Sequence, residues 1–592
     1  SAKEKSNFRL FIIALFVAIL IRYALTYWRV QDGASAHLGY DGYAWESVGY
    51  WIIQTGYLDN TITQSYPAGF VFFITGGVIY YPNVSLFHIH YYNKAIPALV
   101  FITDILLMFA ICQKVKPYNK FFVTFSTFSI FSAYYFFYRL SAFVPTMITS
   151  IFFLLFFYFL ISKEIPKWVS GLTLGGGLLS HPLYGAIMVA IYLFFEVYSL
   201  LVEIIQYKKQ KESFSLKSIL FTKIKHIILV LIPVLAFIFI FGLYLTYYYY
   251  SAWYMGYLYY FQIDLISAFR AANFILPPNG QYIRLSLDNV FYENLPEGIG
   301  SSLKSFIARI FPSFVFFFLY LLCFFFPLSK IKNQTIRTSI RFLKVLNFIC
   351  LLFFFLYLIY AILPLAWIPL LGTFVASSFY GIYYFRLIEI VTPFLLLFMG
   401  LVFAQILEIV EQKTKHFYSK LKDLRVFNQQ INRGQLAYIV LSMLIIGGWF
   451  AAFPKYGNYF CEYTTTTRLT EVLIDTRLSQ DEYLEANGLK NGTIICEASN
   501  SSLYLIMEYF FKQDNQIFYH DLNLTKPDFD LYWASNTTSG MIIITTSETI
   551  MFPYLLENYS EYGNLIVRNR EYIAIRRSEE RRVGKECRSR WS

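Results

Sequence analysis

Residues 145–162 read PTMITSIFFLLFFYFLIS, a stretch without a single charged side chain. A helix needs about 20 mostly apolar residues to cross the hydrocarbon core of a bilayer, and this stretch is close to that length. The whole chain shares its character, because 57% of the 592 residues are hydrophobic, 21% are aromatic and only 15% are charged. Soluble proteins carry about 25% charged residues. The composition therefore predicts a polytopic α-helical membrane protein.

Ten further apolar runs have a similar length. They lie near 8–28, 94–112, 120–137, 168–180, 183–206, 227–249, 310–328, 345–365, 387–410 and 436–453. Together the runs predict about 11 transmembrane helices within residues 1–453, with two long loops at 29–93 and 250–309. A shorter apolar stretch, Pro67 to Tyr81, contains Gly76 and Gly77 and is ambiguous by length alone.

Basic side chains decide the topology, because cytoplasmic loops carry an excess of Lys and Arg. The clusters lie at Lys3 to Arg9, Lys114 to Lys120, Lys163 to Lys167, Lys208 to Lys225, Lys330 to Lys344 and Lys413 to Arg433. All of them fall on one side only if the stretch from Pro67 does not span. We therefore interpret that stretch as a helix at the exoplasmic face. The N-terminus is predicted to be cytoplasmic, and the net charge of +12 indicates membrane topology rather than a nucleic-acid partner.

Residues 454–576 are predicted to form an exoplasmic α/β domain. Short β-rich runs alternate there with helical stretches such as Ser502 to Phe511. The runs are Thr493 to Cys496, Gln516 to Tyr519, Met541 to Thr545, Leu565 to Val567 and Tyr572 to Ile575. Cys461 and Cys496 lie in this segment and are either a disulfide pair or two free thiols.

Glycosylation sequons support the exoplasmic location. N-x-S/T occurs at Asn491, Asn500, Asn523, Asn536 and Asn558. Five acceptor sequences in so short a segment favour an extracellular or lumenal surface, in an archaeal or eukaryotic plasma membrane or endoplasmic reticulum. Residues 577–592 have no relation to the domain before them and are interpreted as a non-native tail.

The first long loop contains the most informative acidic residue. It reads GYDGYAWESVGYWIIQTGYLDNTITQSYPAGF from Gly39 to Phe70. Asp41 precedes a helical pattern, so its carboxylate lies at a helix start, where the dipole favours the ionised form. It is therefore either a helix cap or a functional acid. Glu46 and Asp59 are either a second acid for the same site or solvated charges.

The order of features in this loop resembles the GT-C membrane glycosyltransferases. These features are Asp41 just after the first span, an amphipathic helix ending in glycine, and then Tyr66-Pro67-Ala68-Gly69 before another apolar stretch. The superfamily includes oligosaccharyltransferase catalytic subunits, protein O-mannosyltransferases and lipid A aminoarabinose transferases. The resemblance implies a donor sugar linked to a polyprenyl or dolichyl phosphate and a glycan, protein or lipid acceptor. It implies that Asp41 is the acceptor-activating base, with Glu46 as a second catalytic acid.

The same resemblance assigns phosphate-binding and lining residues. Arg386, at the exoplasmic start of the tenth span, is implied to bind the donor phosphate, with Arg139 of the second exoplasmic loop as another candidate. Interfacial snorkelling is the alternative for Arg386. Asp59 and Tyr66 are possible lining residues. Oligosaccharyltransferases carry an acidic metal-binding motif in the second loop, but here that loop reads FFYRLSAFVPT, so no motif supports a divalent metal and no cofactor is certain.

Two further residues lie in or beside spans. His181, within Ser180-His181-Pro182, either lines the site or is a structural residue at a helix end. Asp104 lies inside the second span, where an acid is costly, so it is either functional or satisfied by a partner in the bundle.

Two other functions fit the same layout. A secondary transporter or flippase for a polar or lipid-linked substrate would place functional acids near mid-bilayer, as Asp104 is. A non-catalytic scaffold or receptor would bind its partner through the domain 454–576 alone.

Overall fold

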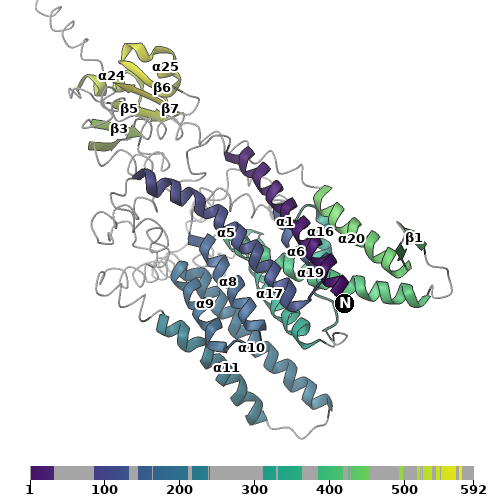
Figure 1. Cartoon of the computed structure of the whole chain (residues 1–592). Coiled ribbons are helices and arrows are strands. Elements are labelled where there is room, and N and C mark those ends of the chain that lie inside the picture. Colours follow the sequence, from purple (N-terminus) through teal and green to yellow (C-terminus); the bar gives the residue numbers. More distant parts are fainter. Residues whose placement is uncertain are drawn as a thin grey trace, which may run out of the picture.

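The computed structural model describes eleven α-helices within the first 451 residues, and five strands and two α-helices near the C-terminus (Figure 1). The described residues are 2–31, 86–132, 145–162, 164–210, 216–237, 239, 311–328, 331, 333–362, 384–417, 424–426, 429–431, 433–451, 493–497, 516–520, 522, 524–535, 542–546, 549–568 and 572–576.

Each of the eleven predicted apolar runs contains a helix. The helices are α1 (Ala2–Gln31), α5 (Leu86–Val115), α6 (Lys120–Phe128) with the 3-10 helix η1 (Ser129–Ser132), α8 (Pro145–Ile161), α9 (Lys167–Ser180), α10 (Pro182–Gln210), α11 (Leu216–Phe237), α16 (Phe314–Cys323), α17 (Gln334–Ile362), α19 (Tyr384–Phe417) and α20 (Arg433–Ala451). Three stretches within them, Ala95–Val115, Tyr184–Ile205 and Val391–Thr414, are long and apolar enough to cross a membrane. The helices of the predicted spans are therefore confirmed, while the number of spans stays a prediction.

Helix α19 lies at the centre of the bundle. Every residue from 391 to 404 is buried. Most of these residues are apolar, so by composition alone the helix could equally face lipid. The helix packs against α5, α6, α8, α16, α17 and α20. A helix that is hydrophobic all round is expected in such a position, because it has no polar face to present to water.

Aromatic side chains fill the contacts around this central helix. Trp449 of α20 is fully buried, with ring centroids 5.2 Å from Phe125 and 4.9 Å from Phe316. Its indole Nε1 donates to the Ser129 carbonyl oxygen at 3.1 Å, which satisfies the one polar atom of the ring. Edge-to-face aromatic pairs of this kind are worth about 1 kcal/mol beyond area burial. They join α20, α6 and α16 on one side of α19.

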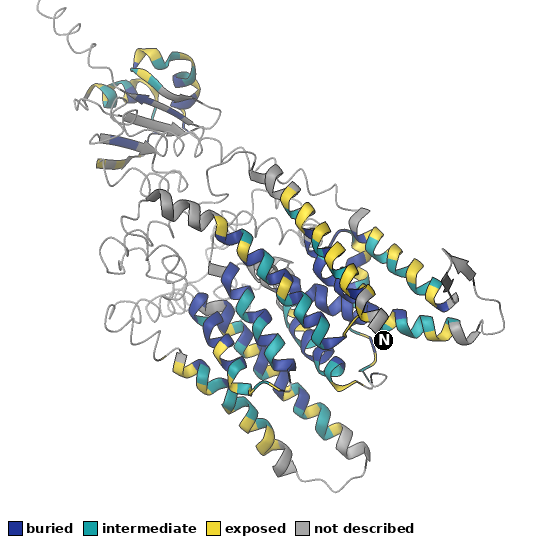
Figure 2. Ribbon diagram, viewed as in Figure 1, coloured by how far each residue is buried: buried dark blue, intermediate teal, exposed yellow. Residues whose placement is uncertain are grey.

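Large apolar side chains are exposed on the outer helices (Figure 2). Leu10 and Ile13 of α1 are 65% and 62% exposed, and Met443 and Leu444 of α20 are 69% and 65% exposed. A soluble protein rarely exposes contiguous apolar surface of this kind. The outer face is instead that of a protein whose solvent is lipid.

The C-terminal strands form one mixed sheet. They are β3 (Thr493–Glu497), β4 (Gln516–His520), β5 (Ile542–Thr546), β6 (Asn564–Arg568) and β7 (Tyr572–Arg576), arranged in the order β4-β3-β5-β7-β6. Strands β4, β3 and β5 are parallel, whereas β7 and β6 are antiparallel additions. All five predicted strands are confirmed to within one residue at each end. The predicted helix from Ser502 to Phe511 lies outside the described residues.

Two helices that we did not predict cover this sheet. They are α24 (Lys526–Ser535) and α25 (Met551–Asn558), and their Phe529, Phe552 and Leu555 share a buried cluster with Ile573 and Ile575 of β7. We call the five strands with these two helices the sheet unit. In Figure 1 it lies beyond the end of the bundle at which α1 ends and α5 begins.

The loop between α19 and α20 carries a small hairpin that we did not predict. Strand β1 (Leu424–Val426) pairs antiparallel with β2 (Gln429–Ile431). The basic cluster in this loop had indicated only that it lies on the cytoplasmic side. Leu424, Val426 and Ile431 are the apolar positions that a short ribbon can use, but strands of three residues are too short for a period-two pattern to stand out.

Candidate functional site

Most of the predicted site lies outside the described residues. Asp41, Glu46, Asp59 and Tyr66 belong to the segment 32–85, and Arg139 to the segment 133–144. Their assignments stay predictions. The structure does describe the helices that carry these segments, and these helices can be oriented from their contacts.

Contacts among charged groups identify one end of the bundle. Lys114 at the end of α5 pairs with Glu164 of the α8–α9 turn at 2.7 Å, and Lys116 pairs with Glu408 near the end of α19 at 2.6 Å. Lys223 of α11 pairs with Glu196 of α10 at 3.2 Å. We call this the basic end, because its lysines come from two of the basic clusters, Lys114 to Lys120 and Lys208 to Lys225, and Glu164 lies within a third, Lys163 to Lys167. The sequence predicts that it faces the cytoplasm.

At this end, burial and the charge of a neighbouring carboxylate have opposite effects on the pKa of Lys116. Burial lowers the pKa of Lys116 below its ordinary value, and the nearby Glu408 carboxylate offsets part of that effect. By contrast, the hydrogen bond and charge of Lys114 lower the pKa of the exposed Glu164 carboxyl. Glu164 favours the charged form of Lys114, and Glu408 favours the charged form of Lys116. The two ion pairs attach the turns between helices to the bundle.

The opposite end holds the anchors of the predicted catalytic loop. Helix α1 runs antiparallel to α5, since Phe8 contacts Tyr118 with ring centroids 5.3 Å apart and Tyr23 contacts Phe101 at 5.9 Å. Gln31 at the end of α1 and Leu86 at the start of α5 therefore both lie away from the basic end. The segment that contains Asp41 is joined to the bundle at these two points.

Arg386 belongs to the same opposite end. It lies in the first turn of α19, 22 residues before Glu408, which corresponds to about 33 Å along a helix axis. Its side chain lies outside the described residues. Because α19 is the central helix, the start of that helix marks the middle of the bundle at this end. Arg386 and the anchors of the Asp41 loop are thus on the same side of the bundle by backbone position.

His181 is a buried residue at the turn between α9 and α10. It lies 14 residues after Lys167, and its backbone N–H donates to the Gly177 carbonyl oxygen at 3.0 Å, which caps α9. The imidazole is 5% exposed and its centroid is 4.3 Å from that of Tyr184. These contacts show the structural role that we gave as one of two interpretations. They leave the lining role as a prediction.

Asp104 is fully buried in α5 and has a partner on α8. The Ser150 hydroxyl donates to Asp104 Oδ2 at 2.7 Å and also lies 2.8 Å from the Met147 carbonyl oxygen. Ser150 is only five residues from the start of α8, about 8 Å along the helix axis. Measured along α8, Asp104 therefore lies within about one and a half helical turns of the end of the bundle opposite the basic end. This hydrogen bond gives Asp104 a partner within the bundle, and its functional role stays a prediction.

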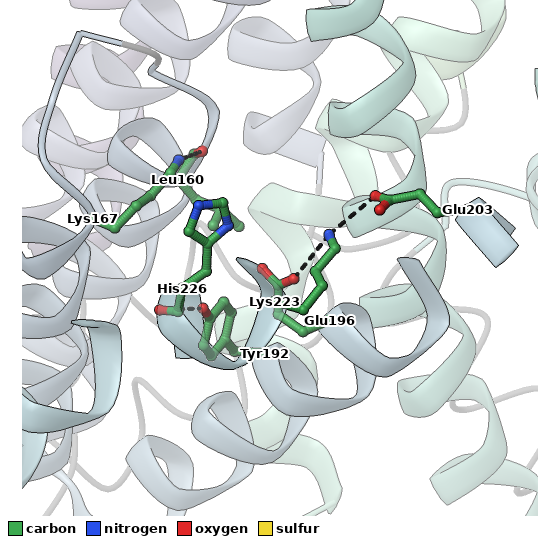
Figure 3. Close-up of polar contacts among 7 residues, drawn as sticks. All are labelled: Leu160, Lys167, Tyr192, Glu196, Glu203, Lys223 and His226. Atoms are coloured by element: carbon green, nitrogen blue, oxygen red, sulfur yellow. Dashed lines mark hydrogen bonds and ion pairs between the residues drawn. The ribbon is translucent and has the colours of Figure 1, made fainter. Parts of the chain in front are cut away.

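A partly buried ion cluster near the basic end was missed by sequence reasoning. Lys223 lies between Glu196 and Glu203, with Nζ to carboxylate distances of 3.2 and 3.1 Å (Figure 3). Tyr192 donates to the His226 carbonyl oxygen at 3.4 Å beside them. Glu196 interrupts an apolar run, which is the same signal that singled out Asp104, so the rule applied there would have found it.

The described residues were also searched for clusters of potential metal ligands. Within those residues no group of three or more His, Cys, Asp or Glu side chains could hold a metal ion. The acidic residues of the Asp41 loop are outside that search.

The chain was compared with known proteins. No family model and no curated protein matches it. Its structure is similar to the oligosaccharyltransferase of Archaeoglobus fulgidus in the apo form, with a TM-score of 0.47 and 12% identity over 92% of this chain and 70% of that one. It is also similar to ArnT from Cupriavidus metallidurans bound to undecaprenyl phosphate, with a TM-score of 0.45 and 9% identity over 95% of this chain and 98% of that one.

Another structure of the archaeal enzyme, AglB, holds an inhibitory peptide and a dolichol-phosphate. Each of these alignments covers more than 90% of this chain.

Proposed function

We propose that this chain is a membrane glycosyltransferase that moves a sugar from a polyprenyl- or dolichyl-phosphate-linked donor to an exoplasmic acceptor. The proposal rests on one observation: the two ends of the Asp41 loop and Arg386 all lie at the same end of the bundle. The Asp41 loop is anchored at Gln31 and Leu86, and Arg386 begins the central helix, all at the end opposite the basic end. These backbone positions support the proposal that Asp41 is the general base and that Arg386 binds the donor phosphate at the same end of the bundle.

The proposed reaction balances with these two side chains. The acceptor oxygen attacks the anomeric carbon while the Asp41 carboxylate takes the proton of the acceptor. The bond between the anomeric carbon and the phosphate oxygen breaks, and the lipid phosphate leaves with the electron pair. The Arg386 guanidinium supports the negative charge that develops on that phosphate, in a bidentate geometry that lysine does not offer. The reaction as written needs no redox cofactor.

The helical layout supports a donor that arrives from the membrane. The outer helices expose apolar side chains to lipid, and α5 extends 18 residues from Leu86 to Asp104, about 27 Å, so it continues past the start of α8 (Figure 1). A lipid-linked sugar in the outer leaflet would have its phosphate at the level of the interface, where the start of α19 is predicted to lie. The acceptor would approach from the side of the sheet unit.

The base assignment is tested with Asp41→Asn in membranes. The probe is dolichyl phosphate carrying a tritiated hexose, and the readout is release of the label from the lipid. We expect a loss of at least about a hundredfold in kcat for Asp41→Asn, because a general base contributes about that much or more. Glu557→Gln, an exposed acid of α25, is the matched control and should keep full activity. Unchanged turnover of Asp41→Asn would remove Asp41 as the base.

The phosphate assignment has its own variant. Arg386→Gln should raise KM for the lipid donor more than it lowers kcat, and Arg386→Lys should recover only part of the loss, because lysine keeps the charge without the planar fork. Equal activity of the Lys and Gln variants would show that the guanidinium does not bind phosphate.

One observation favours a transporter or flippase as a second candidate. Asp104 is fully buried inside α5, where transporters carry coupling acids. In proteoliposomes the transporter hypothesis predicts that Asp104→Asn abolishes flux of a lipid-linked sugar while Asp41→Asn leaves it intact. The transferase hypothesis predicts that label release depends on Asp41. The two variants therefore separate the two functions.

A further inference from the structure

Strand β4 forms one edge of the sheet unit. Among the described residues it pairs only with β3, in a parallel register that runs from Thr493 beside Gln516 to Glu497 beside His520. An edge strand presents a row of backbone N–H and C=O groups with which a further strand can pair. The sequence of β4, QIFYH, contains no lysine, arginine, acid or proline, the residues that usually prevent such pairing. Within the described part of the chain, this edge is therefore available to an added strand.

The opposite edge of the sheet, β6, is protected in ways that β4 is not. The ladder between β6 and β7 is irregular between Leu565 and Val567, as in a β-bulge. A bulge twists an edge and interrupts regular pairing. The strand also begins with the exposed Asn564 and ends with Arg568. Of the two edges, β4 is the one that offers regular pairing.

An apolar row crosses the sheet on the face that α24 and α25 cover, and it ends at Phe518. The backbone register places Phe518 beside Ile495. From Ile495 the row continues through Ile543 to Ile575. Ile495 and Ile575 are 3% and 1% exposed and belong to the buried cluster of the two helices, whereas Phe518 is 46% exposed. The helices thus cover the row as far as β3 and leave its last side chain half exposed.

Polar side chains lie on either side of Phe518. Gln516 and His520 are two positions away along the strand, so they project from the same face, and both are exposed. The His520 ring lies 5.8 Å from that of Tyr532 of α24, which confirms that this is the helix-covered face. A strand added beside β4 would place one residue against Phe518 and its neighbours at two positions' distance against Gln516 and His520. The best match is an apolar residue flanked in this way by uncharged polar ones.

We propose that the β4 edge binds a segment of an exoplasmic polypeptide, which adds to the sheet as an extended strand with an apolar residue against Phe518. The backbone of an extended polypeptide matches N–H and C=O groups at strand spacing, whereas a lipid or a sugar does not. The half-exposed end of the apolar row supplies the side-chain preference, because an apolar neighbour removes Phe518 from water.

The position of the sheet unit suits such a partner. It lies beyond the end of the bundle at which α1 ends, which is the predicted exoplasmic side (Figure 1). Neither Asp41 nor Arg386 takes part, so polypeptide binding is separate from the proposed reaction and can be measured without a sugar donor.

The test uses the full chain purified in detergent. The probe is a soluble fluorescent peptide in which threonine and valine alternate, with leucine as the central residue and lysines at both ends. Fluorescence anisotropy should show saturable binding with a Kd below about 0.1 mM. Phe518→Lys should raise the Kd at least about tenfold, because it removes the apolar contact and places a charge at the edge. If that variant does not fold, Phe518→Thr, which keeps a residue favoured in strands, should still weaken binding.

Two matched controls separate strand addition from general adhesion. Leu531→Lys introduces the same charge at a side chain of α24 that is 71% exposed, and it should leave the Kd within about twofold of the wild type. A peptide with N-methylated amides at the central leucine and the next valine keeps its side chains but cannot pair regularly along either of its own edges. It should bind at least about tenfold more weakly.

The place of binding is found with a benzophenone side chain in the central position of the peptide. Illumination should crosslink it to residues 516–520, as mapped by mass spectrometry. Crosslinks confined to other segments overturn the site, and equal binding of the N-methylated peptide overturns strand addition. Absence of saturable binding below about 1 mM overturns the proposal, and is the result expected if this chain or a second copy already occupied the edge.

Discussion

Ser150 Oγ donates a hydrogen bond of 2.7 Å to Asp104 Oδ2, and this contact joins α8 to α5 inside the bundle. The two residues are 46 positions apart in the chain, and both are fully buried. In a low-dielectric interior a carboxyl group is tolerated only when its oxygens are hydrogen-bonded. The serine therefore allows the acid to be retained near the predicted acceptor side.

Removal of that hydroxyl should destabilise the protein. We expect Ser150→Ala to lower the free energy of unfolding by about 1 to 3 kcal/mol, because one oxygen of a buried acid loses its donor. The thermal unfolding midpoint in detergent measures this. Ser442→Ala is the control, since Ser442 donates only to the Tyr438 carbonyl oxygen of its own helix at 2.7 Å. Equal midpoints for the two variants would contradict the proposed importance of the contact.

Removal of the Lys223 side chain should lower the free energy of unfolding more than removal of either partner carboxylate, Glu196 or Glu203. Its removal in Lys223→Met leaves Glu196 and Glu203 facing each other without a cation, which we expect to cost about 3 kcal/mol. Glu196→Gln should cost less, because the amide oxygen still accepts from Lys223 and Glu203 remains. The effects of the two substitutions should be non-additive in the double variant, by about 0.5 to 3 kcal/mol. Chemical unfolding of the wild type, the two single variants and the double variant completes this double-mutant cycle. Strict additivity would mean that the ion pair contributes nothing.

Close packing of α9 against α11 depends on a glycine. A Cβ at Gly171 would overlap the Val230 carbonyl oxygen, a backbone atom that cannot rotate away. We expect Gly171→Ala to cost about 1 to 3 kcal/mol through overpacking. At Gly447 of α20 a Cβ meets nothing within 4 Å, so Gly447→Ala should be neutral or stabilising by up to about 1 kcal/mol. Thermal midpoints measured side by side test the pair, and destabilisation by both would point to a general intolerance of helix substitution.

The sheet unit should lose stability at alkaline pH through Tyr562. Burial and the hydrogen bond of 2.6 Å to Asp530 Oδ1 raise the pKa of Tyr562 above its ordinary value of 10.0. The protonated phenol is thus favoured in the folded state. Its contribution to stability is complete below pH 10 and is lost as the pH rises toward the folded-state pKa, because the unfolded chain ionises first.

The measurement for this prediction compares unfolding midpoints at pH 9 and pH 11. The unfolding midpoint of the wild type should fall more between pH 9 and pH 11 than that of Tyr562→Phe, because the phenylalanine cannot ionise. Tyr559→Phe serves as the control, because the Tyr559 hydroxyl makes no hydrogen bond among the residues that the structure describes, and it should behave as the wild type does. A parallel pH response of wild type and Tyr562→Phe would refute the assignment.

The candidate site was predictable only in part. A costly acid within an apolar run identifies Asp104, and the same rule applied to residues 183–206 would have identified Glu196. Lys223 was not predictable as the centre of an ion cluster, because it belongs to a basic cluster that topology alone explains. Its pairing with Glu196 and Glu203 is a property of packing.

The sequence by itself determined the helices of the apolar runs and the five strands of the sheet. Transfer of apolar residues to lipid and the two-residue period of a strand are local effects, so each can be read from a short window. Helices α24 and α25 were missed because they are only 10 and 8 residues long, and helices this short depend on packing, here against the sheet that they cover. Only the tertiary structure decided which helices meet.

Helix partners in this chain depend on contacts between residues that are far apart in sequence. Trp449 reaches Ser129 across 320 positions and Asn119 reaches Glu408 across 289. Such contacts arise from the shape of whole helix surfaces, with glycines such as Gly171 permitting close approach and aromatic rings filling the space between. No local pattern contains that information, which is why the basic end was predictable as a side of the membrane and not as a set of ion pairs.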